Sequence, residues 1–124
     1  MLDNKNIDDY DLFDKSKIDN LILAIGNEKA LEFLNNYLTS LKQQYPVIIQ
    51  NIIELDYYKI EFAAHKLASG AGTFGHMKLH HLLLYIEDVA REKDPHSLFK
   101  SQESLSLVKS VAVKSIELLE GYIS

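Results

Sequence analysis

The feature that most constrains this chain is the spacing of its apolar residues, which recur every three or four positions over long stretches. Between residues 27 and 53 they fall at Leu31, Leu34, Leu38, Leu41, Tyr45, Ile48 and Ile52. This spacing places them on one face of a helix, whereas a half-buried strand alternates apolar and polar residues. The sequence contains no such alternating run and no Asn-Gly or Asp-Gly hairpin turn. We therefore expect an all-α protein.

Residues that favour helix ends divide the chain into one short helix and four long ones. Candidate start residues precede four of the five: Ser16, Asn27, Asp56 and Asp94. Gly26 closes the short helix, and Pro95 suits the first turn of the last one. Pro46 lies inside the second helix, where its ring and missing N–H predict a kink or a local break. Short connections between long helices favour an up-and-down four-helix bundle with a short N-terminal capping helix.

The same spacing predicts which residues of the later helices face the core. They are Ile60, Ala64, Leu67 and Ala71 in the third helix, Leu79, Leu82, Leu83, Ile86, Val89 and Ala90 in the fourth, and Leu105, Val108, Ala112, Ile116, Leu119 and Ile123 in the last. Residues 1–15 are acidic and lack the spacing. We expect them to form a tail or a loosely docked arm, followed by one helical domain over residues 16–124.

Composition and charge exclude several classes of protein. The chain has 124 residues, of which 47% are apolar, and this suffices for a single core. Its net charge is −5 and its 13 Lys and Arg are scattered, so it lacks the basic stripe that a nucleic-acid-binding protein needs. No apolar run approaches the roughly 18 residues of a membrane span, and the acidic N-terminus does not resemble a signal peptide. Cysteine is absent, which suits a reducing compartment. We expect a cytoplasmic protein that binds neither nucleic acid nor membranes.

A glycine-rich segment, Gly70-Ala-Gly72-Thr-Phe-Gly75, matches the G-x-G-x-x-G pattern of nucleotide-binding loops. That pattern indicates phosphate binding only when a strand precedes it, and the residues before Gly70 have helical spacing. The simpler interpretation is a helix that ends in small residues, with Gly75 as its left-handed cap. Glycine inside a helix is unfavourable, so we expect something to lie close to the backbone at Gly70 and Gly72.

His65 lies about 140° from the core direction of the third helix, given 100° of rotation per residue. It therefore faces solvent. The same sector of the helix holds Tyr58, Glu61, Phe62, Ser69 and Gly72. Two aromatic residues and several small ones around a nucleophilic side chain suggest a surface that docks a partner. Exposed histidines without any function are common, so geometry alone leaves that alternative open.

Three other histidines suggest a second type of site. His76 and His80 are four positions apart and His81 is adjacent, so they could face one metal ion. No Glu-x-x-His or His-Glu-x-x-His motif accompanies them, and a surface pair is the simpler interpretation. A metal-binding helical bundle stays open as an alternative. A little further on, four charged residues have the spacing of a solvated helix face: Glu87, Asp88, Arg91 and Glu92.

The segment from Ala63 to Gly75 resembles the signature of histidine-containing phosphotransfer (HPt) domains. That signature has an alanine-histidine pair, then an aliphatic residue, small residues, and a glycine ten positions after the histidine. Ala64, His65, Leu67 and Gly75 match it. The resemblance covers residues 63–75 by motif, and the expected helices of residues 16–122 agree with its architecture.

The resemblance implies a function in a two-component phosphorelay. His65 would accept a phosphoryl group from the aspartate of a receiver domain and pass it to another receiver aspartate. A neutral imidazole offers an unprotonated nitrogen for this step. The partners would be response-regulator receiver domains or a hybrid histidine kinase. The receiver would supply Mg²⁺, so this chain, a monomer without kinase or ATP-binding activity of its own, would need no cofactor.

Two positions depart from the family pattern. Many members have a lysine three positions after the histidine, where this chain has Ala68, and a glycine four positions after it, where this chain has Ser69. Lys66 could partly replace the lysine, and Ser69 could crowd the histidine or donate a hydrogen bond to the phosphoryl group. A protein of the same fold that docks a receiver without efficient transfer is therefore a further alternative.

Overall fold

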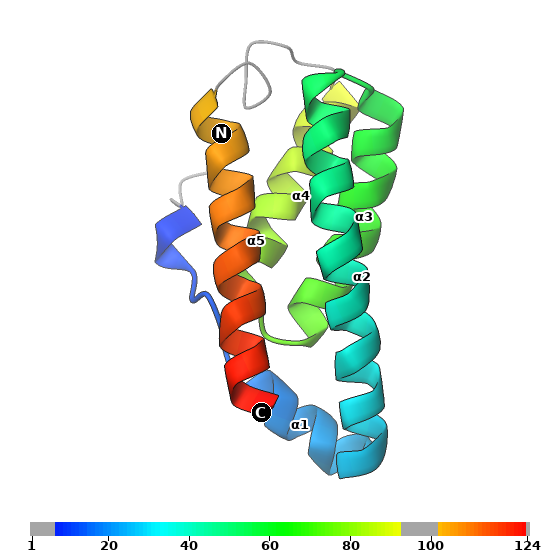
Figure 1. The fold of residues 1–124 in the computed structure, drawn as a ribbon, viewed down its shortest axis with the longest axis vertical. Helices are drawn as coiled ribbons and strands as arrows, with labels where there is room; N and C mark the ends of the chain where they lie inside the picture. The colour runs from blue at the N-terminus through cyan, green and yellow to red at the C-terminus, as the bar shows by residue number, and fades with distance from the viewer. Residues whose placement is uncertain (1–6, 93–101, 124) are drawn as a thin grey trace.

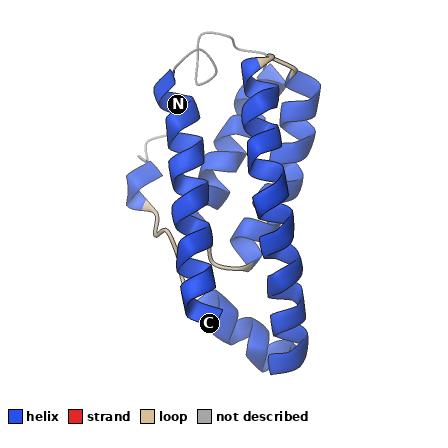
Figure 2. Cartoon of the chain, viewed as in Figure 1, coloured by secondary structure: helices blue, strands red, loops and turns tan. Residues whose placement is uncertain are grey.

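Five α-helices and a short 3-10 helix make up the described part of the computed structural model, which covers residues 7–92 and 102–123. The elements are η1 (Ile7–Asp9), α1 (Ser16–Ile25), α2 (Asn27–Ile53), α3 (Tyr57–Thr73), α4 (Met77–Glu92) and α5 (Gln102–Ile123) (Figure 1). No strand occurs within these two ranges (Figure 2). The expectation of an all-α protein is confirmed.

The long helices pack side by side. α3 lies along α4 and also packs against α2, and α5 packs against α2 and α4. α1 lies across one end of the molecule and contacts α2, and η1 packs on α4 (Figure 1). None of the helices in the described part is both long enough and apolar enough to cross a lipid bilayer.

The predicted helix starts are partly correct. Asp56 caps α3, where its side chain accepts a hydrogen bond from the backbone N–H of Lys59. Ser16 is the first residue of α1, and Lys15 holds the cap position. Asp14 accepts hydrogen bonds from both the N–H and the hydroxyl of Ser16. Asn27 is likewise the first residue of α2, and Gly26 holds the cap position. Asp94 and Pro95 lie outside the described residues.

Pro46 does not break its helix. α2 runs without interruption from Asn27 to Ile53, with Pro46 inside it. Of the two outcomes that the sequence predicts at this position, a local break is therefore wrong.

The core forms where the apolar spacing predicts it. All of the expected inward residues of α3 and α4 are buried, as are Val108, Ala112, Ile116 and Leu119 of α5. Leu31 of α2 is an exception, because it is exposed. It lies near the start of α2, beside a shallow hollow that α1 and the last residues of α5 leave partly open. The spacing of apolar residues within one helix does not show where the helices that cover it end.

Part of the expected N-terminal arm lies against the helices. The backbone N–H of Asp14 donates to the carbonyl of Gly75, and that of Lys78 donates to the carbonyl of Asp11. The ring of Tyr10 stacks on His81 with centroids 3.7 Å apart. These contacts hold residues 10–14 beside the turn between α3 and α4 and the first residues of α4.

His76, expected on the surface, is fully buried. It lies in the turn before α4, where Phe13 of the arm packs 5.8 Å from it between ring centroids. Its Nδ1 and the hydroxyl of Tyr37 are 2.7 Å apart and share a hydrogen bond. Burial lowers the pKa of His76 to about 4 and raises the pKa of Tyr37, so both side chains are neutral at pH 7. The surface prediction is wrong because the arm covers a position that the helix spacing alone leaves open.

This burial predicts a pH dependence of stability. The unfolded histidine titrates near the ordinary histidine pKa of 6.5 and the folded one near 4, so the unfolded state binds more protons between these values. The free energy of unfolding should therefore fall as the pH is lowered from 6.5 to 4, by about 3 kcal/mol from this group. Denaturant unfolding of the wild type and of His76→Phe over this range isolates the effect. Parallel curves for the two proteins would contradict it.

Candidate functional site

His65 lies on the exposed side of α3, as its position in the helix predicts. Its side chain is 73% exposed, and its Nδ1 lies 3.0 Å from Oε2 of Glu87 on α4. The imidazole is therefore accessible to another protein while one of its nitrogens is held by this one.

Glu87 is the site residue that the sequence pattern does not reveal. Its spacing with Asp88, Arg91 and Glu92 predicts a solvated face, and those three residues are indeed exposed, but the side chain of Glu87 is only 8% exposed. Glu87 is four positions after Leu83 and three before Ala90, both of which are buried. That spacing places Glu87 at the edge of the core face and is the one signal of its burial in the sequence.

The contact determines which nitrogen of His65 is free. An ionised carboxylate only accepts hydrogen bonds, so Nδ1 carries the proton that Glu87 accepts. In a neutral ring the lone pair is then on Nε2, at the far edge of the imidazole from Glu87. The arrangement presents an unprotonated nitrogen on an exposed side chain, which is what a nucleophile requires.

Arg91 completes a group of charges beside His65. Its Nη2 lies 2.6 Å from Oε2 of Glu87, its Nε lies 3.2 Å from Glu61, and its Nη1 lies 3.1 Å from Asp88. The hydrogen bond with Glu61 and the charges of Glu87, Glu61 and Asp88 raise the pKa of the guanidinium, which stays charged. One cation thus joins carboxylates from α3 and α4.

Two aromatic side chains stand next to the histidine. Tyr58 is 79% exposed and Phe62 is 64% exposed. With Glu61, His65 and Glu87 they line one shallow hollow between α3 and α4. The structure therefore brings together three of the residues expected around His65, namely Tyr58, Glu61 and Phe62, and adds Glu87.

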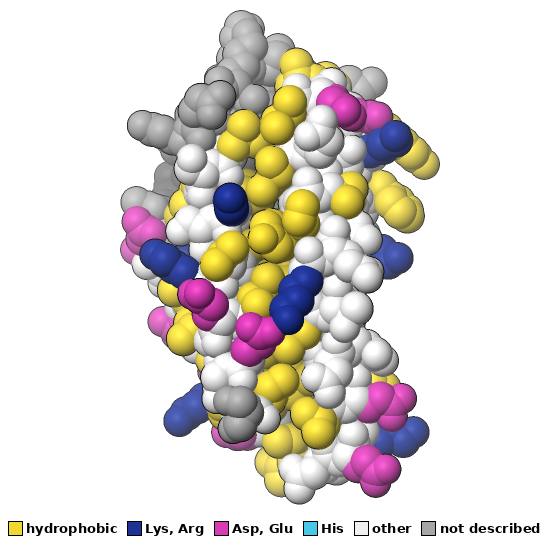
Figure 3. All heavy atoms as spheres, viewed as in Figure 1, with side chains coloured by type: hydrophobic (Ala, Val, Ile, Leu, Met, Phe, Trp, Pro, Cys, Tyr) yellow, Lys and Arg dark blue, Asp and Glu magenta, His cyan; other side chains and the backbone are white. Residues whose placement is uncertain are grey.

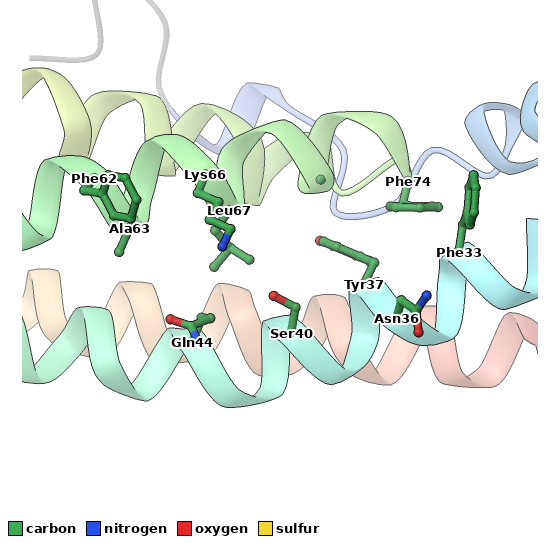
Figure 4. A pocket seen from close by; sticks show the side chains of 11 residues that line it. Phe33, Asn36, Tyr37, Ser40, Gln44, Phe62, Ala63, Lys66, Leu67 and Phe74 are labelled. Carbon is green, nitrogen blue, oxygen red and sulfur yellow. The ribbon is translucent and has the colours of Figure 1, made fainter.

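Lys66 lies on a different side of α3. It lines a groove between α3 and α2 together with Phe62, Ala63 and Leu67 of α3 and residues such as Ser40 of α2 (Figure 4). Lys66 does not line the hollow that contains His65 and Glu87. Phe62 borders both the groove and the hollow, so the two form a continuous surface.

The remaining expected site residues are spread along α3. Ser69 is exposed, and its backbone carbonyl accepts a hydrogen bond from the Thr73 hydroxyl. Ala68 is buried, and its carbonyl lies 2.7 Å from Nδ1 of His80. Gly72 is half-buried under the ring of His80. Neither Ala68 nor Gly72 therefore contributes open surface beside His65.

Each glycine of the G-x-G-x-x-G segment allows one close contact within the protein. A Cβ at Gly70 would lie 2.8 Å from the ring of Tyr37, one at Gly72 would lie 2.9 Å from His80, and one at Gly75 would lie 2.3 Å from the carbonyl oxygen of Asp14. Gly75 has a φ of +88°, as the expected left-handed cap requires. The segment ends a helix, and its glycines serve packing.

Gly26 and Gly75 have similar backbone conformations but different surroundings. Alanine substitutions at the two positions therefore separate the cost of backbone strain from the cost of a packing clash. Gly26 and Gly75 have φ values of +87° and +88°, but a Cβ at Gly26 would meet nothing within 4 Å. Gly26→Ala should cost about 1–3 kcal/mol through backbone strain alone. Gly75→Ala should cost more, because the new Cβ also clashes with the backbone of Asp14. Thermal or denaturant unfolding of both variants tests this. Equal losses of stability would contradict it, because the arm would then move away from the new Cβ at no cost in free energy.

Each of the three histidines of the possible metal site has a partner other than these three, although the rings of His80 and His81 also meet edge to face with centroids 5.0 Å apart. His76 binds Tyr37, His80 binds the carbonyl of Ala68, and His81 stacks on Tyr10. Within residues 7–92 and 102–123 no group of three or more His, Cys, Asp or Glu could hold a metal ion.

Figure 3 shows the face formed by α2 and α5, where apolar side chains and charges of both signs are intermixed and no histidine of the described part is visible. Tyr58, Phe62 and His65 belong to α3. Comparisons of the chain with protein-family models, with curated proteins and with solved structures found no match.

Proposed function

We propose that this chain is a histidine phosphotransfer protein of a two-component phosphorelay, in which His65 accepts a phosphoryl group from one receiver aspartate and passes it to another. The observation that carries the proposal is the contact between Nδ1 of His65 and Glu87 on an exposed face. The resemblance of residues 63–75 to the HPt signature agrees with it. The proposal includes an up-and-down arrangement of α2 to α5 with α1 as the N-terminal cap, and a monomer in the cytoplasm.

The chemistry requires little beyond the imidazole. The Nε2 lone pair attacks the phosphorus of the receiver's aspartyl phosphate, a P–N bond forms, and the P–O bond to the aspartate breaks to release a carboxylate. The ring then carries both Nδ1–H and the phosphoryl group and gains a positive charge. The carboxylate of Glu87, 3.0 Å from Nδ1, balances that charge. Transfer to the next receiver reverses the same step.

In the proposed reaction the receiver contributes the remaining groups. It supplies Mg²⁺ and the acidic pocket around its aspartate, so that transfer depends on positioning the two reacting groups. Tyr58 and Phe62 are exposed next to His65. Aromatic residues are enriched at the cores of protein interfaces, and tyrosine is among the residues that most often dominate the binding energy. We infer that they anchor the receiver with its aspartate opposite Nε2.

A docking protein without efficient transfer is the second candidate. The observation that favours it is Ala68, which is buried at the position where many HPt domains have a lysine. Lys66 does not line the hollow of His65. The phosphoryl group would therefore receive less stabilisation from cationic side chains of α3.

Incubation with a receiver phosphorylated on its aspartate separates the two candidates. Radiolabel should move to the wild type and to the matched control His81→Gln, and not to His65→Gln. The label should be stable to base and labile to acid, as a phosphoramidate is. Glu87→Ala should keep the label on His65 but slow its arrival by about tenfold or more, because the ring proton is no longer held on Nδ1.

Two results would contradict phosphotransfer. Label that persists in His65→Gln would place the acceptor elsewhere. A stable complex with the receiver and no label on the wild type would identify the docking protein instead.

A further inference from the structure

Arg91 is in contact with the group that holds His65. Oε2 of Glu87 accepts two hydrogen bonds, because it lies 3.0 Å from Nδ1 of His65 and 2.6 Å from Nη2 of Arg91. The imidazole and the guanidinium therefore share one carboxylate oxygen. The atom that accepts the His65 proton is thus also in contact with Arg91.

We propose that Arg91 is a positioning residue, which holds the carboxylate of Glu87 so that it keeps the proton of His65 on Nδ1 and leaves Nε2 free to react. The effect of Arg91 on phosphotransfer rests on the proposed function of His65. The effect of Arg91 on which ring nitrogen carries the proton is independent of that function.

Burial explains why Glu87 needs this partner. Burying a carboxylate until it is only 8% exposed costs folding free energy unless an opposite charge compensates it. A neutral imidazole offers the carboxylate one hydrogen bond and no charge. Arg91 supplies a positive charge 2.6 Å from Oε2 and holds the carboxylate of Glu87 in a fixed direction. Without Arg91, the carboxylate would lose this charged partner and turn toward water, away from Nδ1 of His65.

The guanidinium is itself fixed by two further contacts. Glu61 of α3 accepts from Nε at 3.2 Å, and Asp88 of α4 accepts from Nη1 at 3.1 Å. Three different nitrogens of one planar group thus bind three carboxylates. A lysine has a single ammonium on a flexible stem and cannot reproduce this arrangement. Glu61 lies one turn before His65 on the same helix, so Arg91 also ties the histidine's own helix to Glu87.

The tautomer of His65 gives a direct readout. Two-bond proton–nitrogen correlation spectra of protein labelled with ¹⁵N in its histidines distinguish Nδ1–H from Nε2–H in a neutral ring. The wild type should show mainly Nδ1–H at His65. A neutral imidazole in water favours Nε2–H, and a hydrogen bond at one nitrogen decides which form is present. Arg91→Met should therefore shift His65 to mainly Nε2–H.

Two further variants make the test specific. Lys59→Met also removes a cation from this part of the protein, but Lys59 pairs with Asp56 and not with Glu87, so its His65 should keep the wild-type tautomer. Arg91→Lys keeps the charge without the planar group and should give an intermediate ratio. Circular dichroism shows whether each variant is folded. If Arg91→Met does not fold, the tautomer ratio of Arg91→Lys provides the readout.

The outcomes are distinct. Mainly Nδ1–H in folded Arg91→Met, or a wild-type ratio in Arg91→Lys, would overturn the proposal. In the receiver assay, Arg91→Met should slow labelling by about tenfold. If the tautomer depends on Arg91 but wild-type His65 takes no label, Arg91 is still the positioning residue and the proposed phosphotransfer is wrong.

Discussion

The hydrogen bond between His65 and Glu87 is the interaction on which the rest of the site depends. It joins an exposed side chain of α3 to a nearly buried carboxylate of α4, so it exists only because these two helices lie close together. Small residues make that approach possible. Gly72 leaves room for the ring of His80, which in turn bonds the carbonyl of Ala68. Gly75 then turns the chain back and admits the arm at Asp14. The residues that resemble a phosphate-binding loop therefore act through helix packing.

The electrostatics of the site differ from those expected from the family pattern. The expected lysine position is occupied by Ala68, which is buried, and Lys66 lies in the groove toward α2. The cation nearest to the His65–Glu87 contact in the described part of the chain is Arg91, which contacts Glu87 itself. Charge is therefore supplied from α4 to the Nδ1 edge of the imidazole, opposite the proposed reactive nitrogen Nε2. In the proposed transfer, this arrangement favours activation of the ring over strong binding of the phosphoryl group.

Much of the fold follows from local patterns in the sequence. The spacing of Ile60, Ala64 and Leu67 is sufficient to orient α3 and to place His65 outside, because a helix with one apolar stripe has a single stable orientation against a core. The patterns fail where distant segments meet. His76 is buried because the arm covers it, and Glu87 is buried because α3 packs over the edge of α4. Both depend on how elements are placed relative to one another. The spacing of Glu87 from Leu83 and Ala90 is the one sign of this placement in the sequence, and it places Glu87 only at the edge of the core face.

The position of the phosphoryl group on the ring is the most direct test of transfer through Nε2 of His65. Phosphorylated protein labelled with ¹⁵N in its histidines can be examined for phosphorus–nitrogen coupling at His65. We expect coupling to Nε2, with Nδ1 still protonated and hydrogen-bonded to Glu87. Coupling to Nδ1, or a phosphoryl group on any other residue, would contradict it.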